Sequence, residues 1–291
     1  MKRIARRRSA WSLAPPRAEG FFGWLHEEAI AVSDLVSGVG STAPSSSPSG
    51  ILGQASMYVM VPFLDATVAQ ACLLQGVELA TPAWVPAGKH PVLYSFGFHR
   101  GVRPRYMDPS LAVDYNETVI GIPWVQFRQP DGSTSGPYFQ FTSIRLDNTW
   151  AQWIGIALGL PKQLAIFDVG DATYSFTMQP GANPVMSGTF GPPGATFGPD
   201  FPNFQTIEPS LMQQPVISRM PDGVYILTSF QFDRPDSSMF AAEADFTIAD
   251  NSLTGLPASV YDFPGLDVTA FGGCFHGVYN WVMSQPSQVL L

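Results

Sequence analysis

The sequence has little charge, few lysines and almost no cysteine. Of its 291 residues 13% are charged, and its lysines are Lys2, Lys89 and Lys162. The two cysteines, Cys72 and Cys274, have no CxxC spacing, so the sequence suggests neither a disulfide framework nor a zinc site. No stretch of 18 residues is apolar without interruption by Gly, Pro or polar residues, which excludes a membrane-spanning helix.

Apolar residues and backbone breakers are abundant instead. Hydrophobic residues make up 45% of the chain, enough to bury a core, so disorder is excluded as the dominant state. Gly and Pro number 27 each, which argues against an all-helical bundle and is typical of short strands joined by turns. We therefore expect a soluble protein built mainly from strands.

Positive charge is concentrated at the start of the chain. The first 17 residues hold six of the fifteen cations and no acid, whereas residues 18–291 carry nine cations against 23 acids, a formal charge of −14. A surface of this sign repels phosphate backbones and anionic lipids. The charge pattern therefore excludes nucleic acid and membrane surfaces as partners of the main domain.

The first fifty residues differ from the rest. We expect a basic arm, a short amphipathic helix over residues 23–36 and a Ser/Pro linker over 41–50, followed by one domain over 51–291. The arm lacks the apolar core of a secretory signal, so we expect a cytoplasmic protein. Arg6–Arg8 leave a twin-arginine export sequence as the alternative.

Turn residues divide the domain into strands. Two hairpins are predicted around Asp-Gly turns, Val119–Phe127 with Tyr138–Ile144 and Pro215–Arg219 with Val224–Phe232. A strand over Tyr58–Leu64 precedes a helix that Asp65 caps. The segment Gly181–Asn203, rich in Gly and Pro, is predicted to be a loop.

One apolar helix leads to a lysine. Asn148 can cap a helix that is apolar on nearly every side, so we expect it to be buried, and Gly159 and Pro161 end it. Lys162 follows, and its stem can simply pack while its ammonium reaches water. Alternatively it is a nucleophilic amine, which at neutral pH needs a pKa lowered by desolvation to about 7–8.

Several motifs occur in the order found in acetoacetate decarboxylase. The segment Leu160–Leu164 resembles the segment of that family that contains the Schiff-base lysine. Acetoacetate decarboxylase is itself a standard example of an enzyme with an activated lysine. Four further matches, in chain order, are Tyr115–Glu117 with Ile122-Pro123, then Tyr138, then Leu146–Asn148, and finally Pro209–Met212 with Pro221–Gly223. The resemblance spans roughly residues 51–291.

The resemblance implies a fold and a site. The fold is mainly β (α+β), an antiparallel curved sheet or partial β-barrel of acetoacetate decarboxylase type with a few packed helices. Lys162 would form a Schiff base with a keto substrate, and Glu117 would face it as proton donor or acceptor. The family also forms homo-oligomers, and we expect the same here.

Three departures from the family pattern remove charge. Gln163 replaces the second lysine, Gly155–Ala157 replaces a Gly-Arg-Glu motif, and Ser56–Tyr58 replaces an Arg-Glu-Tyr motif whose arginine is expected to hold the substrate carboxylate. The resemblance thus implies a substrate bulkier and less anionic than acetoacetate. We predict a Schiff-base lyase of decarboxylase, aldolase-dehydratase or cyclase type. The alternatives are simple β-keto acid decarboxylation and a non-catalytic ligand-binding relative.

The remaining site predictions concern binding. We expect the substrate to contact Tyr115, Trp124, Ile144, Trp153, Leu160 and Gln163. The cationic patch formed by His99, Arg100, Arg103 and Arg105 can replace the missing carboxylate clamp or be a solvated loop. The four histidines show no metal-ligand spacing, so we expect no metal and no cofactor.

Overall fold

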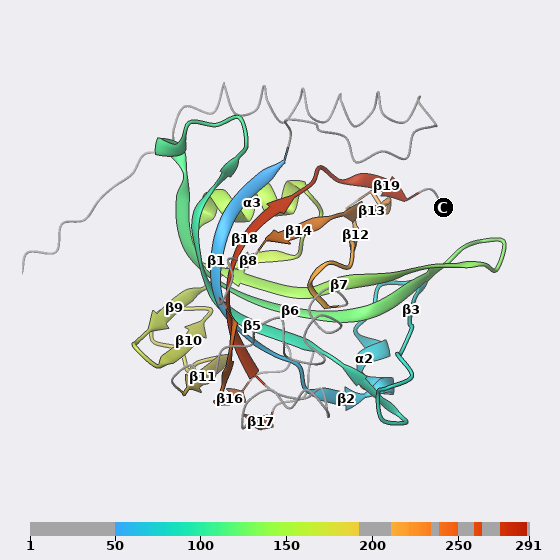
Figure 1. Ribbon diagram of the computed structural model, residues 1–291, viewed down its shortest axis with the longest axis horizontal. Helices are drawn as coiled ribbons and strands as arrows, with labels where there is room; N and C mark the ends of the chain where they lie inside the picture. The colour runs from blue at the N-terminus through green and yellow to red at the C-terminus, as the bar shows by residue number, and fades with distance from the viewer. Residues whose placement is uncertain are drawn as a thin grey trace, which may run out of the picture. The chain divides into compact units, whose positions relative to one another are not determined.

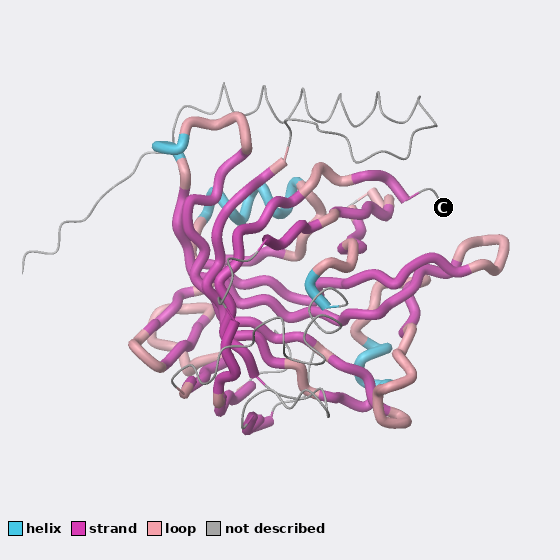
Figure 2. Tube along the Cα trace, in the orientation of Figure 1, coloured by secondary structure: helices cyan, strands magenta, loops and turns pink. Residues whose placement is uncertain are grey.

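The computed structural model describes residues 50–191, 211–220, 222–233, 239–249, 259–263 and 274–289, which all belong to one compact unit. The predictions for residues 1–49, and for the Phe-rich part of the loop beyond residue 191, lie outside these residues. Strands dominate (Figure 2), so the prediction of a mainly β protein with few helices is confirmed. None of the described helices is long and apolar enough to cross a membrane.

A 12-stranded sheet forms the body of the domain. Its main path runs β14-β18-β1-β5-β6-β7-β12-β13-β19, and β15, β3 and β8 pair with β18, β6 and β7. The strands are β1 (Ile51–Met60), β3 (Val77–Leu79), β5 (Leu93–Pro104), β6 (Val113–Arg128), β7 (Thr134–Leu146), β8 (Lys162–Leu164), β12 (Val216–Arg219), β13 (Tyr225–Thr228), β14 (Phe230–Asp233), β15 (Met239–Ala242), β18 (Cys274–Met283) and β19 (Ser287–Val289). The sheet is strongly curved and nearly closed, like a barrel (Figure 1).

Two smaller sheets complete the fold. A five-stranded sheet has the order β17-β16-β11-β10-β9, and β2 pairs with β4. Their bounds are β2 (Phe63–Asp65), β4 (Lys89–Pro91), β9 (Ile166–Val169), β10 (Thr173–Thr177), β11 (Met186–Phe190), β16 (Ala244–Ile248) and β17 (Ser259–Phe263). Strand β11 lies inside the predicted loop Gly181–Asn203, so that prediction was wrong there: Met186 and Phe190 are buried, which a pattern rich in Gly and Pro concealed.

The predicted hairpins are present. Strands β6 and β7 pair antiparallel, and Gly132 at their turn has a φ of 84°, a conformation that glycine adopts without strain. Strands β12 and β13 also pair antiparallel, with Gly223 at a φ of 94°, but the predicted strand Val224–Phe232 is divided, and its second part, β14, pairs with β18 instead. The predicted strand at Tyr58–Leu64 is instead the end of β1 and the start of β2, because the extended chain bends at Val61 and Pro62.

Helices are short and few. Helix α2 (Ala66–Ala71) begins after Asp65 as predicted, but no side chain caps it, since the Asp65 carboxylate accepts a bond from Lys89. In the described segments there is one 3-10 turn, η1, which covers Pro109–Leu111. Helix α3 (Thr149–Ala157) is capped by Asn148, whose side chain accepts a hydrogen bond of 3.0 Å from the Ala151 amide.

The prediction that this central helix is buried on all sides was wrong. Trp153 and Ile156 are 51% and 46% exposed. Helix α3 buries Ala151, Ile154 and Gly155, because it packs on the sheet through one stripe of its surface.

The two faces of β5 and β6 have different neighbours. Tyr94, Phe96, Ile120 and Ile122 belong to a buried cluster with Phe176 and other residues of the five-stranded sheet. Alternate residues of the same strands face the other way. That second face borders the candidate site.

Candidate active site

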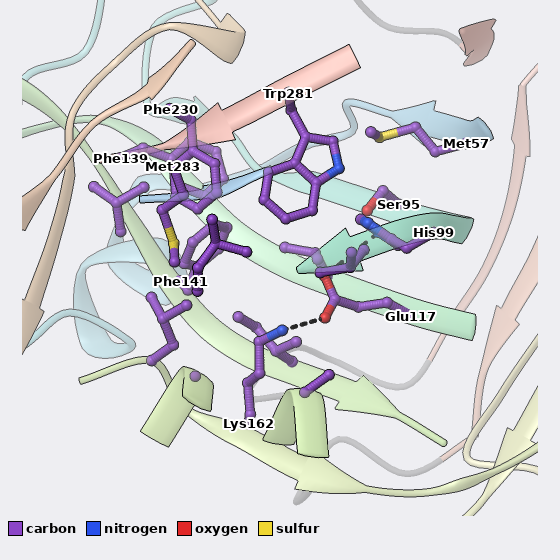
Figure 3. A pocket seen from close by; sticks show the side chains of 18 of the residues that line it. Met57, Ser95, His99, Glu117, Phe139, Phe141, Lys162, Phe230, Trp281 and Met283 are labelled. Carbon is purple, nitrogen blue, oxygen red and sulfur yellow. Dashed lines mark hydrogen bonds and ion pairs between the residues drawn. The ribbon is translucent and has the colours of Figure 1, made fainter. Parts of the chain in front are cut away.

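One cavity lies within the curved sheet, closed on one side by α3. Its lining comes from strands β1, β5, β6, β7, β8, β12, β14 and β18 together with α3. The space open to the centre of a water-sized molecule is about 120 Å³, whereas one water needs about 10–15 Å³ by this measure. Most of the lining is apolar, including Met57, Phe139, Phe141, Phe230, Trp281 and Met283 (Figure 3).

Lys162 enters this cavity from β8. The strand runs parallel to β7, and its register sets Lys162 beside Ile144. The lysine Nζ donates a hydrogen bond of 2.6 Å to Glu117 Oε2, and both side chains are buried. The ammonium also lies 5.4 Å from the centre of the Tyr115 ring, within the range of a cation–π contact. The fold thus buries an ion pair in mostly apolar surroundings.

Gly155 makes room for the lysine stem. A Cβ atom at this position would lie 2.2 Å from Lys162 Cδ and 2.7 Å from Cε. Glycine inside a helix costs about 1 kcal/mol relative to alanine. Helix α3 carries it at the point where Lys162 crosses toward Glu117.

Glu117 also faces a histidine. His99 on β5 places Nε2 3.6 Å from Glu117 Oε1, the oxygen that does not bond to Lys162. The His99 ring stacks on Tyr115 with centroids 5.0 Å apart and an interplanar angle of 5°. Burial lowers the pKa of His99, an effect that the charge of Glu117 opposes and that of Lys162 reinforces. At neutral pH the imidazole is therefore uncharged.

Tyr115 completes the polar side of the cavity. Burial raises the pKa of its phenol well above the usual value, and the negative charge of Glu117 adds to that effect. The phenol is therefore protonated throughout the physiological range. Within the described ranges, no group of three or more His, Cys, Asp or Glu residues is placed to hold a metal ion.

The structure gathers five of the predicted site residues. Lys162, Glu117, Tyr115, Ile144 and Leu160 all line the cavity. They come from β6, β7, the turn before β8 and β8 itself, segments that the sheet brings together although up to 47 positions separate them.

Three predicted contacts lie elsewhere. Trp124 lines a separate hollow with Gln126 and Pro137, because register shifts on β6 and a left-handed backbone at its own position, φ 50°, turn it away. Trp153 lies on the solvent side of α3. Gln163 is exposed, since alternate residues of a strand point to opposite sides.

Of the two interpretations of the cationic patch, the carboxylate clamp is not assembled. His99 lines the cavity, but Arg100, Arg103 and Arg105 do not, and the Arg100 guanidinium lies over the Phe98 ring instead. Among the described residues that line the cavity, Lys162 is the only lysine or arginine. The described walls therefore offer no second cation for a carboxylate.

Sequence reasoning missed Ser95, Gly155 and the apolar lining from β14 and β18. Ser95 shares a strand face with His99, and the alternation of Leu93, Ser95, Gly97 and His99 is a signal that could have identified it. Nothing local marks Trp281 or Phe230, because their positions depend on pairing between distant strands.

Comparison with known proteins identifies the fold. No protein-family model and no curated protein sequence matches this chain. The structure is similar to the enduracididine biosynthesis enzyme MppR complexed with the condensation product of pyruvate and imidazole 4-carboxaldehyde, with a TM-score of 0.56 and 14% identity over 86% of this chain and 96% of that one.

Two further structures agree. Acetoacetate decarboxylase from Legionella pneumophila has a TM-score of 0.54 and 15% identity over 87% of this chain and 93% of that one. An acetoacetate decarboxylase-like enzyme from Sphingomonas wittichii RW1 has a TM-score of 0.52 and 11% identity over 86% and 97%. The chain therefore has an acetoacetate decarboxylase-like fold, as its motifs predict.

Proposed function

We propose that this protein is a Schiff-base lyase that uses Lys162 as its nucleophile. The observation that carries the proposal is the buried contact of 2.6 Å between Lys162 Nζ and Glu117 Oε2 in an apolar cavity. The shared fold supports it, because acetoacetate decarboxylases have the same architecture. A lysine in such surroundings can lose its proton to a partner only 2.6 Å away.

Glu117 accepts a proton at the start of imine formation and donates it again when water leaves. It takes one proton from the Lys162 ammonium, which frees the amine to attack the ketone carbonyl. The carbinolamine then loses its hydroxyl as water, and the Glu117 proton leaves with it. Ammonium and ketone become protonated imine and water, so Glu117 ends as the carboxylate that faces the new positive charge.

The cavity favours an apolar keto substrate. Its walls are mostly aromatic and aliphatic, and Lys162 is already paired with Glu117. A free carboxylate on the substrate would find no other lysine or arginine in the described lining. Burying an unpaired charge is costly, so the cavity should bind a neutral, bulky ketone more tightly than a keto acid.

Several reactions can follow the imine. The iminium draws electrons from the neighbouring carbon, so loss of CO₂, cleavage of a carbon–carbon bond or removal of a proton all give an enamine. The complex of MppR with a condensation product of pyruvate and an aldehyde supports aldol-type chemistry on this fold. We therefore place aldol cleavage, condensation or dehydration ahead of decarboxylation.

Borohydride trapping tests the proposal. The protein is incubated with aliphatic methyl ketones and borohydride, and its intact mass is measured. We expect one substrate-sized adduct, mapped to Lys162 and absent from Lys162→Ala. Lys89→Ala, which removes an exposed paired lysine, is the matched control and should keep the adduct. No adduct with any ketone at neutral pH would favour a non-catalytic ligand-binding protein, and release of CO₂ from a β-keto acid would favour decarboxylation.

A further inference from the structure

Strand β5 presents a polar face beside the ion pair. Its inward residues Ser95, Gly97 and His99 stand opposite Val119, Glu117 and Tyr115 of β6 in the antiparallel register. Gly97 is thus the direct partner of Glu117 and contributes no side chain. Ser95 and His99 both project from this strand into the cavity that Glu117 lines, and Figure 3 shows them on the same side of Glu117.

Ser95 presents a hydroxyl to the cavity. Its residue is 5% exposed and lines the cavity. Its Oγ is not one of the fully buried polar atoms without a partner in the described part of the chain, so the hydroxyl is open to the cavity. When a bound molecule displaces water from this hydroxyl, the hydroxyl needs a new partner, because leaving it unpaired costs about 1–3 kcal/mol. A bound molecule can supply that partner.

His99 offers an uncharged donor at the same place. Its side chain is 12% exposed, and its Nδ1 is buried with no hydrogen-bond partner among the described residues. A neutral imidazole carries a single N–H, and an N–H on Nδ1 would have no acceptor. The proton therefore belongs on Nε2, which faces Glu117 Oε1 at 3.6 Å.

Glu117 selects against a second anion at this position. A carboxylate bound by Ser95 and His99 would lie beside Glu117 Oε1 and be repelled by it. A hydroxyl avoids this repulsion, because its oxygen accepts from His99 Nε2 or Ser95 Oγ while its proton is donated to Oε1. The polar groups around this end of the cavity therefore match a neutral alcohol.

We propose that Ser95 and His99 form an oxygen-binding subsite for an uncharged hydroxyl on the carbon β to the ketone that Lys162 attacks, so that the substrate class is β-hydroxy ketones. The inference rests on the proposed imine chemistry. The spacing follows from Glu117, whose two oxygens face Lys162 and His99. In a β-hydroxy ketone one carbon separates the ketone carbon from the carbon that bears the hydroxyl. The ketone carbon can therefore lie at Lys162 while the hydroxyl lies at His99, the two residues that the Glu117 oxygens face.

The test compares three probes of similar size: heptan-2-one, 4-hydroxyheptan-2-one and 3-oxooctanoate. The concentration that gives half of the maximal borohydride adduct at Lys162 is measured for each by intact mass. For the wild-type protein we expect this concentration to be about tenfold lower for the hydroxy ketone than for the plain ketone, the effect of one or two added hydrogen bonds. The keto acid should require the highest concentration.

Variants assign the preference to the two side chains. Ser95→Ala and His99→Phe should each bring the ratio between the two ketones close to one, and phenylalanine preserves the stacking surface against Tyr115. His99→Gln, whose amide can donate from the place of Nε2, should restore part of the preference. The control is Ser218→Ala, which removes a buried serine hydroxyl outside the cavity and should keep the wild-type ratio.

The outcomes separate the two proposals. Adducts at Lys162 with no preference for the hydroxy ketone, or a preference that survives in Ser95→Ala and His99→Phe, overturn the subsite and leave the imine chemistry standing. Tighter trapping of 3-oxooctanoate also overturns it. No adduct with any probe overturns the imine chemistry and the subsite with it. Near-ultraviolet circular dichroism checks that each variant is folded.

Discussion

Two lysines of this chain form ion pairs of nearly equal length in opposite surroundings. Lys162 lies 2.6 Å from Glu117, and the two side chains are 9% and 7% exposed. Lys89 lies 2.7 Å from Asp65, with 43% and 64% exposed. Distance alone therefore does not distinguish a reactive lysine from a surface contact. Burial decides, because a low dielectric makes the protonation state of one partner depend on the other.

Removing one member of each pair should give the largest contrast. Lys162→Ala leaves Glu117 buried with no cation, so we expect the free energy of unfolding to fall by about 3–5 kcal/mol. Urea denaturation followed by circular dichroism measures this. In the double variant Lys162→Met with Glu117→Gln no charge is buried, and most of the stability should return. If Lys162→Ala cost no more than Lys89→Ala, burial would not be the difference between the pairs.

Gly155→Ala should disturb the buried pair alone. The new Cβ would lie 2.2 Å from Lys162 Cδ, so the flexible stem has to move and Nζ leaves its position at Glu117. A displacement of about 1 Å can cost on the order of a hundredfold in rate, so we expect a loss of that size in the rate of borohydride trapping. Because the new methyl group overpacks this site, the free energy of unfolding should also fall, by about 1–3 kcal/mol. Trapping at the wild-type rate would mean that Gly155 does not position the lysine.

Acidification should lower the free energy of unfolding through the histidine that contacts the buried pair. Burial lowers the pKa of His99 in the fold, so the unfolded chain takes up a proton near pH 6.5 while the native protein does not. The associated stability is complete above that pH and is lost as the pH falls, by up to about 1.4 kcal/mol per unit. His90 and His276, whose pKa values burial also lowers, add to the slope. His99→Phe should make the dependence between pH 7 and 5 shallower, and an unchanged slope would contradict this assignment.

The exposed pair should give the smallest effect. Lys89→Ala is expected to lower the free energy of unfolding by less than about 1 kcal/mol, because solvent screens both charges. Raising the salt concentration should shrink this difference further. A larger cost, insensitive to salt, would show that Lys89 and Asp65 share more than a surface contact.

Local chemistry made part of the fold predictable. Asp131 and Gly132 specify a turn, and Asn148 specifies the start of α3, because each acts on backbone groups a few residues away. The pairing of Ile51 with Met283 has no such local signal. The exposure of Trp153 was also beyond the sequence, since a helix that is apolar all round does not reveal which stripe meets the sheet.

The candidate site also contains residues that the sequence predicted and residues that it did not. Lys162 and Glu117 stand in recognisable motifs, and the fold brings them within hydrogen-bond distance. Ser95 was missed because strand β5 was not predicted, so the alternation that places it on one face with His99 was not recognised. A search for alternating residues opposite Tyr115–Glu117 would have found both Ser95 and His99.

The pairing of β1 with β18 also has a consequence for synthesis of the chain. These strands are neighbours in the large sheet although Met60 and Cys274 are more than two hundred residues apart. At about 5–20 residues per second, a ribosome finishes β18 roughly ten to forty seconds after β1. Until then one edge of β1 has no partner and can pair wrongly with other chains. The pairing that forms part of the cavity wall in the finished protein thus leaves the nascent chain open to aggregation, and chaperones that cover free strand edges would act on this segment.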